Sequence, residues 1–122
     1  MSSVPTVATF LYGINNCDTV KKARKWLKMQ RIDIPFQDYR EQPLTSLELS
    51  ALVKMAGWEA IFNKRSTSYR NLSDGDKSNI NEDKAITLMQ AHPTLIKRPV
   101  LFDGDKVLLG FKEADYKKWF NL

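Results

Sequence analysis

The chain has 122 residues, of which 43% are hydrophobic and 27% are charged, with five glycines, five prolines and a single cysteine. This size and composition predict one compact globular domain and exclude collagen-like, low-complexity and intrinsically disordered chains. The formal net charge of +5 would attract anionic substrates or partners. The lysines and arginines are spread along the chain without a zinc-finger, RNP-like or helix-turn-helix pattern, so we do not expect nucleic-acid binding.

The sequence contains no run that is long and apolar enough to span a bilayer. Its first five residues also lack the basic and apolar regions of a secretory signal. A lone cysteine cannot close an internal disulfide, which agrees with a reducing compartment. We therefore expect a cytoplasmic monomer that makes no membrane contact.

The first part of the chain predicts two strands with a helix between them. Residues 6–12 are β-branched and aromatic and are stopped by Gly13. A helix should follow, with Asn16 as its N-cap and Asp18 in its first turn, because apolar residues recur at helical spacing at Val20, Ala23, Trp26 and Leu27. Residues 34–39 read as the second strand. This order predicts a right-handed parallel βαβ unit.

The middle of the chain predicts helices. Thr45 and Glu48 form a capping-box pattern ahead of an apolar stripe, and Gly57 should end that helix. A short helix over 58–62 follows, and then a polar stretch over 66–81 with turn signals at 73–76. The next helix is marked by Ala85, Leu88, Met89 and His92, and Pro93 should end it.

The last third predicts two strands, over 100–102 and 106–111, joined by a turn at Asp103 and Gly104. A final amphipathic helix over 114–120 should cover the sheet with Tyr116, Trp119 and Phe120. The expected fold is α/β, with a mixed four-stranded sheet in a single domain over 1–122 and a helical insertion at about 44–92.

Cys17 stands between the end of the first predicted strand and the start of the first predicted helix. Free N–H groups and the dipole at a helix start stabilise a thiolate and can also bind an oxyanion, although Asp18 adds an opposing negative charge. The alternative is that Cys17 is a small buried filler. Position alone leaves both interpretations open. Val20 stands where a Cys-x-x-Cys motif would have its second thiol, so any disulfide must be resolved by an external thiol.

Other candidate residues have simpler explanations. His92 precedes Pro93 at a helix end, where a structural role is expected, and one histidine with one cysteine is too little for a metal site. The acidic residues at 74, 76, 82 and 83 lack calcium-loop spacing. Arg65 and Arg98 carry guanidinium groups that suit an oxyanion or a carboxylate, with surface salt bridges as the alternative.

Several motifs together resemble the ArsC/Spx family, in its YffB-like branch. They are residues 12–27, with the sequence YGINNCDTVKKARKWL, and the shorter segments DYR at 38–40, GWE at 57–59, NKRST at 63–67 and IKRP at 96–99. The resemblance implies a thioredoxin-like fold with an inserted helical subdomain and a cysteine nucleophile at Cys17. It also implies that Pro99 is a cis-proline facing that cysteine.

In the arsenate reductases of this family the cysteine attacks arsenate, and glutathione with glutaredoxin completes the reduction. By resemblance, Arg98 and Arg65 would assist Cys17. The substrate or glutathione would be held by Asn15, Asn16, Asp18, Thr19 and Pro99. Two departures matter: Gly13 stands where the arsenate reductases have a histidine, and Gly110 with Phe111 stands where they have a third arginine.

The resemblance therefore supports thiol chemistry more firmly than arsenate as the substrate. We expect a glutathione-dependent thiol reductase that takes glutathione, with or without glutaredoxin, as its co-substrate and uses no metal. The alternative is a regulatory module like Spx, which binds RNA polymerase. Spx-type redox switches use a Cys-x-x-Cys pair, and Val20 removes that option.

Overall fold

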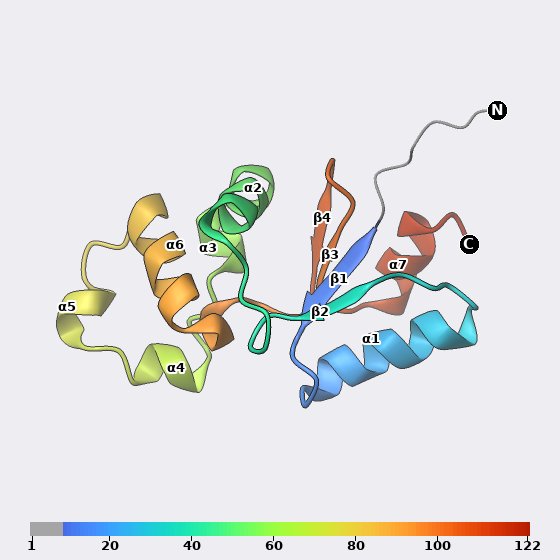
Figure 1. Ribbon diagram of the computed structural model, residues 1–122, viewed down its shortest axis with the longest axis horizontal. Helices are drawn as coiled ribbons and strands as arrows, with labels where there is room; N and C mark the ends of the chain where they lie inside the picture. Colours follow the sequence, from blue (N-terminus) through green and yellow to red (C-terminus); the bar gives the residue numbers. More distant parts are fainter. Residues whose placement is uncertain (1–8) are drawn as a thin grey trace. The chain divides into compact units, whose positions relative to one another are not determined.

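The computed structural model describes residues 9–122 and divides the chain into two compact units. The first unit comprises the chain up to Asp38 together with Arg98–Leu122, and the second comprises Tyr39–Lys97. The elements are labelled in Figure 1. Of the predicted first strand, residues 6–8 lie outside the described part of the chain.

The first unit is built on a mixed four-stranded sheet with the strand order β2-β1-β3-β4. Its strands are β1 (Phe10–Gly13), β2 (Phe36–Asp38), β3 (Val100–Phe102) and β4 (Val107–Leu109). β1 runs parallel to β2, and the helix α1 (Asp18–Met29) forms the crossover between them. β3 pairs antiparallel with both β1 and β4. The predicted βαβ unit, hairpin and mixed sheet are confirmed.

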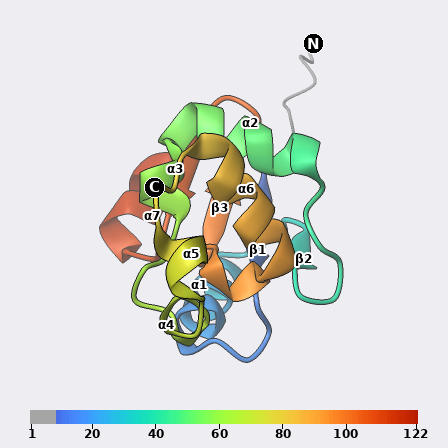
Figure 2. The same ribbon diagram turned by 90° about the vertical axis from the view of Figure 1, so that its left-hand side faces the viewer.

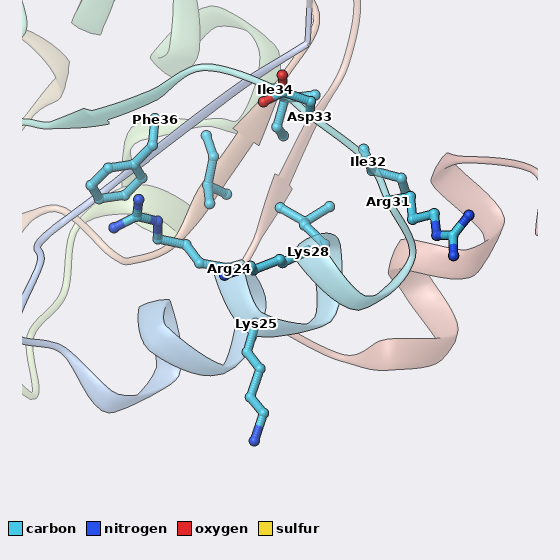
Figure 3. A pocket seen from close by; sticks show the side chains of 10 residues that line it. Arg24, Lys25, Lys28, Arg31, Ile32, Asp33, Ile34 and Phe36 are labelled. Carbon is cyan, nitrogen blue, oxygen red and sulfur yellow. The ribbon is translucent and has the colours of Figure 1, made fainter.

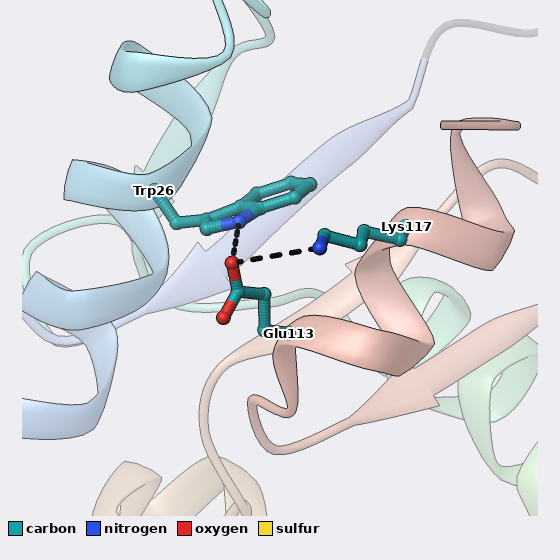
Figure 4. A network of polar contacts seen from close by, with 3 residues as sticks. All are labelled: Trp26, Glu113 and Lys117. Atoms are coloured by element: carbon teal, nitrogen blue, oxygen red, sulfur yellow. Dashed lines mark hydrogen bonds and ion pairs between the residues drawn. The ribbon is translucent and has the colours of Figure 1, made fainter.

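Two helices, α1 and α7 (Glu113–Trp119), pack on one face of this sheet. Leu11 and Leu101 are paired in register on neighbouring strands, and both belong to one buried cluster with Trp26 of α1 and Tyr116 of α7. Trp26 also donates a hydrogen bond from its indole Nε1 to Glu113 Oε1 at 3.1 Å, and Lys117 lies 4.0 Å from the same carboxylate oxygen (Figure 4). This packing fixes the position of α1, which carries Cys17 at its start.

The second unit is helical, as the sequence predicts (Figure 2). Its longer helices are α2 (Ser46–Ala56) and α6 (Glu82–Ala91), which pack against each other. Its shorter elements are α3 (Trp58–Ile61), α4 (Thr67–Arg70), α5 (Asp74–Lys77) and the 3-10 helix η1 (Pro93–Leu95). The capping box of Thr45 and Glu48 is present at the start of α2, and Gly57 ends this helix with a φ of 86°. None of the helices in residues 9–122 is long and apolar enough to cross a membrane.

Two local expectations are wrong. The predicted turn at 73–76 belongs instead to the short helix α5, whose N-cap Ser73 accepts a hydrogen bond from the Asp76 N–H. The N-cap of α1 is Cys17 rather than Asn16, and its side chain makes no capping bond. The carbonyl of Cys17 already accepts the first helical hydrogen bond, from Lys21 N–H at 2.9 Å.

Candidate active site

Three strand ends in the first unit meet at one edge of the sheet. Gly13, the last residue of β1, pairs with Asp38, the last residue of the parallel strand β2. Val100, the first residue of the antiparallel strand β3, lies one position away opposite Tyr12. The loop that leaves β1 and the residues that precede β3 therefore lie at the same edge. The loop after β1 carries Cys17, and the residues that precede β3 are Arg98 and Pro99.

The cysteine loop is held by the side chain of Asp38. Asp38 is buried, and its Oδ2 accepts a hydrogen bond from the Asn15 N–H at 2.9 Å. Arg24, almost two turns along α1, donates from Nη1 to Asn15 Oδ1 at 3.2 Å. Within the loop, the Cys17 N–H bonds to the Ile14 carbonyl at 3.2 Å. A carboxylate from β2 and a guanidinium from α1 thus fix the loop from two sides.

Cys17 is half-buried and occupies the N-cap position, where the first N–H groups of α1 have no partners within the helix. Burial raises the pKa of the Cys17 thiol, but four other effects outweigh it. The nearby Val20 N–H, the Arg98 side chain and the Thr19 N–H favour the charged form and lower the pKa, as does the positive charge of Arg98. The net pKa lies below the ordinary value of a free thiol. The arrangement therefore favours the thiolate, which is the nucleophilic form of cysteine.

The peptide bond between Arg98 and Pro99 is cis, as the resemblance predicts. Pro99 is buried at the start of β3, and its carbonyl accepts a hydrogen bond from the Gly110 N–H at 2.9 Å. This anchors the segment to the end of the hairpin. The Arg98 side chain is thereby positioned to act on the Cys17 sulfur.

The remaining residues with a predicted role differ in their placement. Asn15, Asn16, Asp18 and Thr19 are all exposed around the thiol, so they are available to a substrate. Arg65 belongs to the second unit, where it is exposed and lines a hollow of about 420 Å³ with neighbours that include Lys64 and Lys97. Its part in the chemistry of Cys17 stays a prediction.

Sequence reasoning missed two residues of the site, Asp38 and Arg24. The sequence pattern predicts only a strand at Asp38 and only an exposed helix face at Arg24. The signal for Asp38 was its position at the end of the predicted second strand, which the parallel register places beside Gly13. Across residues 9–122, no group of three His, Cys, Asp or Glu side chains is positioned to hold a metal ion.

Comparisons with known proteins show which family this chain is similar to. The model of the ArsC family matches residues 12–119. An uncharacterised protein of Haemophilus influenzae is 42% identical over 90% of this chain and 96% of its own length. The global transcriptional regulator Spx 2 of Oceanobacillus iheyensis is 31% identical over 89% of this chain and 81% of its own length.

Two solved structures are also similar. A YffB protein shares 40% identity at a TM-score of 0.86, covering 90% of this chain and 96% of its own. A protein of Brucella melitensis related to arsenate reductase shares 40% identity at a TM-score of 0.72, covering 98% and 100%. These neighbours have the fold described above, and the cysteine loop, the cis-proline and α1 all lie within the range that the family model matches.

Proposed function

Since the chain belongs to the ArsC family, we propose that it is a glutathione-dependent thiol reductase in which Cys17 is the nucleophile. The observation that carries the proposal is the environment of the Cys17 sulfur. The N–H groups of Val20 and Thr19 at the start of α1 and the Arg98 side chain all act on the sulfur to lower its pKa. A thiolate held in this way at an exposed loop is typical of reactive cysteines.

The reaction proceeds in two exchanges. The Cys17 thiolate attacks the glutathione sulfur of a substrate that carries a mixed disulfide with glutathione, which forms a Cys17–glutathione mixed disulfide and releases the substrate sulfur as a thiolate. The thiolate of glutathione then attacks the glutathione sulfur of a Cys17–glutathione mixed disulfide. This step forms oxidised glutathione and returns Cys17 as a thiolate. The chain has a single cysteine, so the second thiol must come from outside.

Arsenate is a weaker substrate candidate than a disulfide, because the structure at Gly13 and Gly110 does not readily accommodate the larger residues that the arsenate reductases carry at these two positions. A β-carbon at Gly13 would lie 2.8 Å from Val20 Cγ2, so the histidine of the arsenate reductases does not fit without movement of a buried side chain. Gly110 has a φ of 78°, a conformation that residues with side chains rarely adopt.

Cys17→Ser tests the proposal. We expect the variant to lose the glutathione-linked reduction of disulfides. The assay follows the formation of oxidised glutathione by coupling it to glutathione reductase. Wild-type protein treated with oxidised glutathione should gain one glutathione by intact mass, and the variant should gain none. Lys22→Ala, an exposed change on the same helix, is the matched control and should keep both properties. Unchanged turnover in Cys17→Ser would show that the thiol is not the nucleophile.

A second candidate function is binding to RNA polymerase, which the 31% identity to an Spx regulator supports. Co-purification of polymerase subunits in stoichiometric amounts, retained by Cys17→Ser, would favour this function over catalysis.

A further inference from the structure

A pocket separate from the cysteine loop lies between α1 and the segment that leads into β2. Its volume is about 580 Å³, and all of its lining residues belong to the first unit. Figure 3 shows α1 along one side and residues 32–36 along the other. This volume is within the range of small-molecule sites, about 300–1,000 Å³. Cys17 is not part of the lining.

The floor of the pocket is apolar. Leu11 of β1 and Leu27 of α1 contribute to it, and both belong to the buried core cluster. Ile32, Ile34 and Phe36 form the opposite wall and are only partly buried, although they pack against the same cluster. When an apolar group of a ligand covers such solvent-exposed apolar surface, the free energy of the system falls, which favours binding.

The rim of the pocket is positively charged. Arg24, Lys25 and Lys28 lie on the last two turns of α1, Arg31 follows the helix, and Asp33 is the one acidic residue of the lining. Figure 3 shows Lys25 pointing away from the pocket and Arg24 pointing toward Phe36. The guanidinium carbon of Arg24 lies 4.1 Å from the centre of the Phe36 ring. The charge nearest to the apolar wall is thus a cation.

We propose that this pocket binds a small organic carboxylate with an apolar chain or ring. The apolar part would cover the partly exposed side chains of Ile32, Ile34 and Phe36. The carboxylate would meet Arg24 and Lys28 at the rim. Arginine has five N–H donors, and the bond to Asn15 uses one of them, so its planar group can also bind a carboxylate. The excess of cations over the single acid disfavours a cationic ligand, and the apolar residues of the lining distinguish the site from simple surface charge.

This inference does not depend on the chemistry of Cys17, and its test uses binding alone. ¹⁵N-labelled full-length protein is titrated with octanoate, with acetate and with octylammonium at constant ionic strength. We expect saturable shifts within residues 24–36 for octanoate, and none for acetate, which lacks the chain, or for octylammonium, which has the opposite charge.

Two variants and a matched control sharpen the test. Lys28→Glu and Arg31→Glu each reverse one charge of the lining. Each should weaken octanoate binding by about fivefold, as expected for reversing a charge about 8 Å from the carboxylate in water. Lys22→Glu makes the same change on α1 outside the lining and should leave binding unchanged. Equal binding by the rim variants and the wild type would overturn the proposal. Equal shifts with octylammonium, or tighter binding of an acidic peptide than of octanoate at these residues, would also overturn it.

Discussion

The clearest prediction for stability concerns two fully buried tyrosines, of which only one has a hydrogen-bond partner for its hydroxyl group in the described part of the chain. Tyr39 and Tyr116 are both 0% exposed. The Tyr39 hydroxyl donates to the Ile96 carbonyl at 2.8 Å. Among residues 9–122, the Tyr116 hydroxyl is a buried side-chain atom without a hydrogen-bond partner. Replacing each tyrosine with phenylalanine should therefore have opposite effects.

Tyr116→Phe removes a buried hydroxyl that forms no hydrogen bond with residues 9–122 of the protein. Burying such a group costs about 1–3 kcal/mol in mutational data, so we expect the free energy of unfolding to rise by about 1 kcal/mol. For a chain of this length, that corresponds to an increase in Tm of about 3–5 °C. The ring itself remains in place against Trp26 and Phe111, at centroid distances of 5.8 and 4.8 Å, so the aromatic packing is retained.

Tyr39→Phe is the matched control. It breaks a buried hydrogen bond and leaves the Ile96 carbonyl without this donor, so the free energy of unfolding should fall by about 1–2 kcal/mol. Urea denaturation of the three proteins, followed by tryptophan fluorescence, measures both changes. A loss of stability in Tyr116→Phe similar to that in Tyr39→Phe would refute the reasoning.

The buried Tyr116 hydroxyl also makes the stability of the protein depend on pH in alkaline solution. Burial raises the pKa of Tyr116 well above its ordinary value of about 10. The folded protein keeps this hydroxyl protonated, while the unfolded chain releases the proton above about pH 10. The free energy of unfolding of the wild type therefore falls as the pH rises past that value. The stability advantage of Tyr116→Phe over the wild type should therefore widen above pH 10. A constant difference between pH 8 and pH 11 would contradict the assigned cause.

Two further predictions concern local structure. Gly13→Ala should lower the free energy of unfolding by about 1–3 kcal/mol, because the new β-carbon would lie 2.8 Å from the buried Val20. Gly75→Ala is the control and should leave the free energy of unfolding unchanged, because its β-carbon would meet no atom closer than 3.9 Å. Equal urea midpoints for the two variants would contradict this prediction. Thr45→Ala should destabilise the protein by about 1 kcal/mol by removing the bond from Glu48 N–H to Thr45 Oγ1, and Thr45→Ser should restore it in thermal unfolding.

The sequence predicted well those features that depend on local periodicity. The apolar spacing in α1 identified Val20, Ala23, Trp26 and Leu27, and all four are buried. The capping box at Thr45 and the helix end at Gly57 follow from side-chain chemistry within one turn. These features were recognisable because every residue involved lies within a few positions of its partner.

The features that were missed depend on residues far apart in the sequence. Asn16 has a good cap propensity, but Asp38 and Arg24 hold the loop at Asn15, and the helix begins one residue later, after Cys17. Neither partner lies near the loop in sequence. The contact between Arg98 and Cys17 likewise requires the antiparallel register of β1 and β3. Residue patterns alone placed Arg98 before a strand without a signal for that register, and its role beside Cys17 was expected only from the family resemblance.

The pH dependence of Cys17 alkylation tests the central claim most directly. In the wild type, the midpoint should lie below that of an ordinary free thiol, about 8.5. Arg98→Gln should move it upward, because the variant removes the charge that favours the thiolate. Arg70→Gln, which makes the same change in net charge within the second unit, should leave it in place. A wild-type midpoint at or above the ordinary value, or one that does not respond to Arg98→Gln, would contradict the account of Cys17 as an activated nucleophile.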